Sequence, residues 1–145
     1  MKKFILLILG VFVIATTTAQ IQATHSSSTP TTIYGPRAGV SLNKWVFKGE
    51  FEYYLALNTT NQFDKTMIIN LGSLEKAKIS LNWFIENYVV DQNYTMKDDS
   101  GHSFKAICRP MFGVDGFAFF KEGYAGHAYI RLSDFKRIIK ILNAQ

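Results

Sequence analysis

One cysteine and two histidines are the side chains of this chain best suited to covalent or acid–base chemistry. Cys108 is the only cysteine, so it cannot form a disulfide within its own chain. A nucleophilic thiolate needs a lowered pKa, which a neighbouring histidine such as His127 or His102 could supply. The spacing of the three residues matches no known catalytic motif. A secreted cysteine hydrolase that uses Cys108 with His127 or His102 is therefore kept as an alternative, and whether the protein is an enzyme stays open.

The residues around Cys108 favour a buried, inert thiol instead. Phe104, Ala106 and Cys108 occupy alternate positions, which places them on one face of a predicted strand. Burial in apolar surroundings raises the pKa of a thiol and keeps it protonated. We therefore predict no catalytic residue.

No spacing in the chain indicates a metal or cofactor site. His102 and His127 have no partners at the usual ligand distances along the chain. The turn 98–101 contains two aspartates but lacks the longer ligand sequence of a calcium loop. Gly123 and Gly126 are not followed by the Gly-Lys-Ser/Thr of a phosphate loop. We expect neither a metal nor a cofactor.

Apolar and aromatic side chains outside the predicted core suggest contact surfaces. Ile79 and Trp83 lie four residues apart on a predicted helix, away from its main apolar face. They could contact a protein partner or a second copy of the chain, or be covered by residues 33–42, unless the helix bends. The rings of Tyr54 and Tyr129 could offer a platform for a sugar, or could be ordinary cross-strand packing.

Two strand-to-helix segments must position these side chains. The first joins the strand 67–71 to a helix, and the second joins the strand 128–132 to another. The segments align without gaps at an offset of 61 residues, and Ser73 and Asp134 are the expected N-caps. The apolar face of the first helix contains Leu74, Ala77, Leu81, Phe84, Ile85 and Tyr88. The similarity indicates either a duplicated β-β-α unit or only the common chemistry of such turns.

Alternating apolar and polar residues predict about six short strands around these helices. One half-buried strand is expected from Trp45 to Leu57, with Gly49 as a bulge and Phe47 facing inward. The simplest way to bury both helical faces is an α+β fold, with one antiparallel sheet and both helices on one side of it.

The first 19 residues have the pattern of a secretory signal peptide. Lys2 and Lys3 precede an apolar run of about 12 residues, and Thr17 and Ala19 suit a cleavage site. A bilayer span needs roughly 20 residues, so no stable membrane span is expected after cleavage, and an uncleaved anchor is the alternative. We predict a secreted or periplasmic protein with a signal peptide at 1–19, a flexible or irregular lead-in at 20–43 and a single α+β domain at 44–145.

Charge argues against a nucleic-acid partner. The formal net charge of +5 includes Lys2 and Lys3, and the remaining basic residues are scattered apart from a cluster on the last helix. We therefore predict a small exported, non-catalytic binding or interaction module of unknown ligand. The cysteine hydrolase is one alternative, and a secreted inhibitor or effector of another protein is the other.

Overall fold

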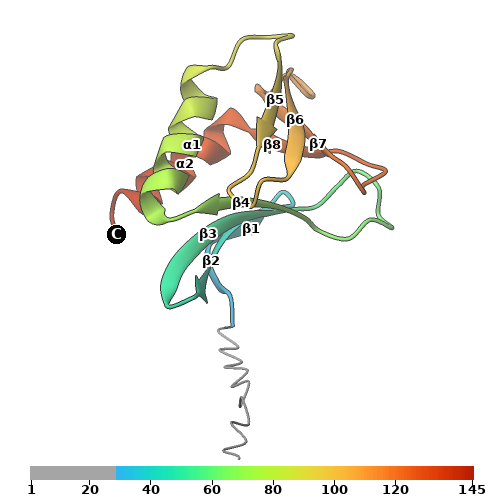
Figure 1. The fold of residues 1–145 in the computed structure, drawn as a ribbon. Helices are drawn as coiled ribbons and strands as arrows, with labels where there is room; N and C mark the ends of the chain where they lie inside the picture. Colours follow the sequence, from blue (N-terminus) through green and yellow to red (C-terminus); the bar gives the residue numbers. More distant parts are fainter. Residues whose placement is uncertain (1–28) are drawn as a thin grey trace, which may run out of the picture.

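The computed structural model describes residues 29–145, which form two antiparallel β-sheets and two α-helices (Figure 1). The predicted signal peptide at 1–19 and the first part of the predicted lead-in lie outside the described residues. Within the described range, each sheet has four strands in sequence order and is followed by one helix. The predicted α+β class is confirmed, whereas the prediction of one sheet of about six strands is wrong.

The two halves of the fold have the same order of elements. The first half comprises β1 (Thr31–Arg37), β2 (Val40–Phe47), β3 (Glu50–Leu57), β4 (Met67–Gly72) and α1 (Leu74–Glu86). The second half comprises β5 (Asn93–Lys97), β6 (Ser103–Cys108), β7 (Gly116–Lys121), β8 (Ala128–Arg131) and α2 (Leu132–Leu142). Each half is thus larger than the expected β-β-α unit. A true duplication stays a prediction.

Two tight hairpins start the first sheet earlier than expected. The turns Ala38–Gly39 and Lys48–Gly49 have positive φ at both residues, 49° and 76° in the first and 51° and 85° in the second. Such two-residue turns match the twist of paired strands, and glycine adopts this conformation without strain. Residues 33–42, predicted to be irregular, therefore form most of β1 and the start of β2, where Val40 and Leu42 are buried.

The turn at Lys48–Gly49 also corrects the prediction of one strand from Trp45 to Leu57. In the observed register, Trp45 pairs with Glu52 and Phe47 pairs with Glu50 across β2 and β3. These pairs lie on the face opposite the buried Leu55 because side chains alternate along a strand. Phe47 is therefore 44% exposed instead of facing the core.

The first sheet ends at β4 because groups from the second half bond to its free edge. Lys121 Nζ donates to the carbonyl of Ile68 at 2.6 Å. The backbone N–H of Asp99 donates to the carbonyl of Asn70 at 2.9 Å. These donors bond to carbonyl groups that a further strand would otherwise pair with, so the second half forms a sheet of its own.

An aromatic core joins the helices to the second sheet. Phe84 of α1 stacks on Phe135 of α2 with ring centroids 5.0 Å apart. Phe84 also meets Phe117 and Phe119 of β7 edge-on at 5.1 and 5.4 Å. Such pairs each contribute about 0.5–1.5 kcal/mol beyond their burial. Within residues 29–145, neither helix has the length and apolar character needed to cross a bilayer.

The two helices begin differently. Ser73 caps α1, since its side chain accepts a hydrogen bond from the Lys76 N–H. Asp134 does not cap α2, because that helix begins two residues earlier and Arg131 precedes it without a side-chain cap. The buried Asp134 carboxylate instead accepts bonds from Arg131 Nε at 2.7 Å and from the Tyr34 hydroxyl at 2.7 Å. It therefore ties β1 to α2.

Candidate functional site

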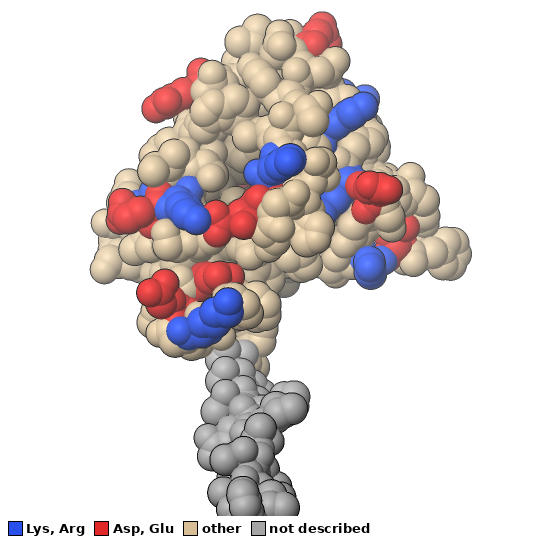
Figure 2. Space-filling view, viewed as in Figure 1, with Lys and Arg blue, Asp and Glu red and all other residues tan. Residues whose placement is uncertain are grey.

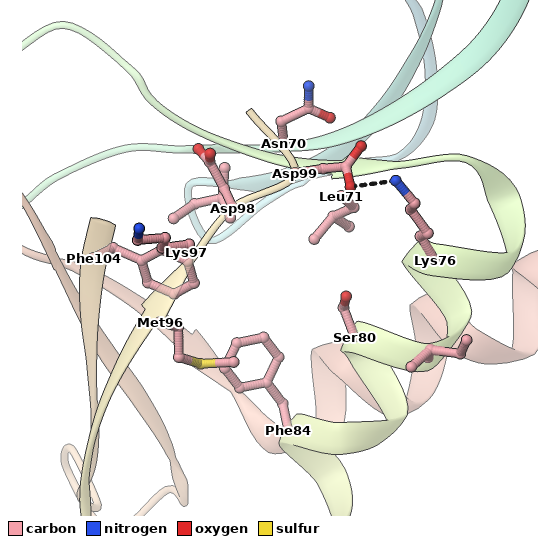
Figure 3. Close-up of a pocket in the computed structure, with 12 residues that line it drawn as sticks. Asn70, Leu71, Lys76, Ser80, Phe84, Met96, Lys97, Asp98, Asp99 and Phe104 are labelled. Atoms are coloured by element: carbon pink, nitrogen blue, oxygen red, sulfur yellow. Dashed lines mark hydrogen bonds and ion pairs between the residues drawn. The ribbon is translucent and has the colours of Figure 1, made fainter. Parts of the chain in front are cut away.

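A hollow of about 240 Å³ lies between α1 and the β5–β6 hairpin, and we call it the α1–β5 groove (Figure 3). Its lining includes the buried Leu71, Phe84 and Phe104, with Met96 beside them. Ile79 also lines the groove, and 70% of its surface is exposed. The groove therefore combines an apolar interior with an apolar side chain in contact with water.

An ion pair closes one end of this groove. Lys76 Nζ of α1 lies 2.7 Å from Asp99 Oδ1, in the turn between β5 and β6 (Figure 3). The hydrogen bond and the charge of Asp99 raise the pKa of Lys76. Gly72 permits this approach, because a Cβ at that position would clash with the Asp99 carboxylate. The start of α1 and the β5–β6 turn are thus held together.

The buried side chain of Asp98 also holds the turn between β5 and β6. Its carboxylate is 1% exposed and lies 2.9 Å from Lys121 Nζ. It also accepts the backbone N–H groups of Ser100 at 3.1 Å and His102 at 2.9 Å. Burial acts to raise the pKa of Asp98, but the bonds from Lys121 and His102 outweigh it and lower the pKa. Asp98 is therefore an ionised anchor of the turn.

A second hollow, of about 370 Å³, lies on the outer face of the first sheet. Trp45, Tyr54 and Ile68 form part of its lining. Trp45 meets Tyr54 edge-on with ring centroids 6.0 Å apart, and its neighbour Phe47 stacks on it at 5.9 Å. Tyr54 was predicted as an exposed ring, but the roles of Trp45 and Phe47 were missed. Gly49 is the only local sequence signal of the turn that places them on this face, and a glycine there fits a strand bulge equally well.

The predicted pair of Ile79 and Trp83 does not form one exposed patch. Trp83 is half-buried and meets Tyr94 of β5 edge-on, with ring centroids 4.8 Å apart. This contact comes from β5, outside the segment 33–42 that was one of the predicted alternatives for covering the ring. Ile79 is by far the more exposed of the two and lies at the rim of the groove.

Tyr129 lies in the second sheet, away from Tyr54 in the first. Its hydroxyl donates to the carbonyl of Arg109 at 3.2 Å and to the carbonyl of Val114. Burial raises the pKa of this hydroxyl. Tyr129 therefore holds the loop between β6 and β7, and the two tyrosines do not share a single platform.

Cys108 and the two histidines occupy three separate environments. Cys108 is fully buried, and burial raises the pKa of its thiol. His102 lies near the opposite end of β6, and its Nδ1 is 3.5 Å from Asp98 Oδ1. His127 Nε2 lies 3.3 Å from Arg109 Nη2, and its ring stacks on Phe120 at 5.1 Å. Burial and the Arg109 charge lower the pKa of His127.

The inner wall of the α1–β5 groove can bury an apolar side chain. Of its charged lining residues, Lys76 and Asp99 are paired with each other, Asp98 is paired with Lys121, and Lys97 has no carboxylate at ion-pair distance within residues 29–145. On the face shown in Figure 2, acidic and basic side chains are interspersed. Among residues 29–145, no three His, Cys, Asp or Glu side chains are grouped as metal ligands. No protein-family model matches the chain, and comparison with curated proteins and with solved structures gives no significant match.

Proposed function

We propose that the protein is a small exported, non-catalytic binding module that holds a protein partner in the α1–β5 groove. One observation carries the proposal: Ile79 is 70% exposed beside a hollow of about 240 Å³ whose lining includes the buried apolar side chains of Leu71, Phe84 and Phe104. The secreted or periplasmic destination expected from the sequence is part of the proposal.

A partner that fills the groove removes water from two apolar surfaces, the inner wall of the hollow and the side chain of Ile79. The loss of this contact with water favours binding. Fully burying a side chain the size of leucine contributes roughly 1.5–3 kcal/mol. A few well-buried residues near the centre of an interface supply most of its binding energy. Phe84 and Phe104 are fixed in the core, so the hollow is formed before the partner arrives.

The partner is either another protein or a second copy of this chain. An inhibitor or effector role would use the same groove and differs only in what the bound protein does. The cysteine hydrolase is not carried further, since Cys108 is buried and neither histidine shares its surroundings.

The test replaces Ile79 with a photoreactive benzoyl-phenylalanine in the cells that make the protein. We expect a specific crosslinked product that disappears when Ser80→Trp fills the hollow. Phe63 is 87% exposed and lies far along the chain, so the same replacement there is the matched control. Equal products from both positions would contradict the proposal. A product with twice the mass of the chain would identify the partner as a second copy.

A further inference from the structure

The free edge of β5 presents unpaired backbone groups beside the groove. The Asp98 N–H donates to the carbonyl of His102 and the Cys108 N–H donates to the carbonyl of Gln92, both at 2.9 Å, so Asp98 pairs with His102 and Gln92 pairs with Cys108 through backbone bonds. In the antiparallel register of β5 with β6, such pairs recur at every second residue. The N–H and C=O groups of Asn93, Thr95 and Lys97 therefore point away from β6. No strand of the described fold pairs with them there.

The other sheet edges in residues 29–145 are closed or irregular. Lys121 and the turn at Asp99 bond to the edge of β4. Thr59 forms a bridge to Ala128 on the edge of β8. The register of β1 shifts twice, and Pro36 in that strand has no N–H to donate. The edge of β5 is thus the regular one that remains open.

The groove lies on one face of this edge. Tyr94 and Met96 are half-buried on the side toward α1, whereas Asn93, Thr95 and Lys97 are exposed. A strand added along β5 would repeat this alternation, with side chains on one face about 6.6–6.8 Å apart. Its inward side chains would therefore enter the groove beside Met96.

The opposite face of the same edge is basic. Lys97, which also lines the groove, and Lys105 are exposed. Alternation along β5 places the Lys97 side chain on the same side as Thr95, whose partner in register is Lys105. Within residues 29–145, neither ammonium group has a carboxylate at ion-pair distance. The outward side chains of an added strand would lie next to these two charges, where acidic groups are favoured.

We infer that the partner of the α1–β5 groove is an extended peptide of alternating apolar and acidic side chains, which joins the second sheet as a fifth strand along β5. The inference rests on the proposed function and adds the conformation and chemistry of the partner. Main-chain bonds to Asn93, Thr95 and Lys97 supply affinity, and the groove and the two lysines supply selectivity.

The test selects short random peptides displayed on phage against the protein. We expect the enriched peptides to alternate apolar and acidic residues. Methylating their backbone nitrogens one at a time should weaken binding about tenfold at every second position and little in between. Thr95→Pro should weaken binding by a similar factor, because it removes an outward donor while keeping the bonds to β6. If Thr95→Pro does not fold, the methylation series still decides the question.

Matched variants separate the two proposals. Combining Lys97→Glu with Lys105→Glu should shift the selected peptides from acidic to basic residues. Peptides that require Ile79 but tolerate Thr95→Pro and methylation at every position would overturn strand addition and leave the proposed groove intact. The absence of enriched peptides, or peptides indifferent to both Ile79→Glu and Thr95→Pro, would overturn both.

Discussion

Trp83 of α1 packs edge-on against Tyr94 of β5, with their ring centroids 4.8 Å apart. The Tyr94 hydroxyl also donates to the carbonyl of Asn87, the residue that caps the end of α1, at 2.8 Å. Together these contacts hold the helix of the first half against the edge strand of the second. They therefore set the separation of the two walls of the α1–β5 groove.

Removing the Trp83 ring should destabilise the fold. We expect Trp83→Ala to lower the free energy of unfolding by about 2–4 kcal/mol, because it leaves a cavity between α1 and β5. Denaturant unfolding followed by circular dichroism measures this change. Ile79→Ala, on the same helix but exposed, should change stability by less than about 0.5 kcal/mol. Equal losses for both variants would contradict the packing role of Trp83.

The Cys108 thiol should be unreactive in the folded protein. Burial shields it and raises its pKa, so little thiolate is available to an alkylating reagent. We expect iodoacetamide to label Cys108 slowly in buffer and rapidly in denaturant, as measured by mass spectrometry. Fast labelling of the native protein, with a midpoint below the ordinary thiol pKa, would instead support the cysteine hydrolase.

His127 should make stability depend on pH in the weakly acidic range. Its pKa in the folded state is lowered from 6.5 by burial and by Arg109. Below pH 6.5 the unfolded chain therefore binds a proton more readily than the folded chain. We expect the free energy of unfolding to fall as the pH drops from 7 toward the folded pKa.

Two variants identify His127 as the source of that slope. His127→Phe keeps an aromatic ring beside Phe120 but cannot take up a proton, so the slope should flatten. Arg109→Met removes the neighbouring positive charge and should also reduce the slope. An unchanged slope in His127→Phe, measured by denaturant unfolding at several pH values, would show that another group titrates.

The helices could be predicted from the sequence because their signals are local. The apolar face from Leu74 to Phe84 repeats at helical spacing, and Ser73 precedes it as an N-cap. The same logic misplaced the start of α2, because Asp134 is drawn into an ion pair with Arg131 and a bond from Tyr34. A carboxylate near a helix N-terminus suits both roles, and only the position of β1 decides between them.

The sheets were harder to predict because their boundaries depend on distant contacts. The alternation from Trp45 to Leu57 continues through the turn at Lys48–Gly49, so one strand and a hairpin look alike in sequence.

Ile79 was correctly singled out as lying off the main apolar face of its helix. Tyr94, which covers Trp83, lies in the other half of the fold, and no local pattern links the two rings.

Lys121 should contribute more to stability than its place near the surface suggests. Its ammonium group lies 2.9 Å from the buried Asp98 carboxylate and also donates to the carbonyl of Ile68. We expect Lys121→Met to lower the free energy of unfolding by about 3 kcal/mol, because it leaves a buried charge without its cation. Lys105→Met, on the neighbouring strand β6 and without an ion pair, is the matched control and should have little effect.

The acid dependence of the same variant provides a second measurement. In the wild-type protein the folded pKa of Asp98 is lowered, so its contribution is present above the ordinary carboxyl pKa and is lost as the pH falls through the folded value. Without Lys121 the folded pKa should rise, so this loss on acidification should shrink or reverse. Adding Asp98→Asn to Lys121→Met should restore part of the stability at neutral pH. A double variant no more stable than Lys121→Met would show that the bond to Ile68, rather than the ion pair, joins the two sheets.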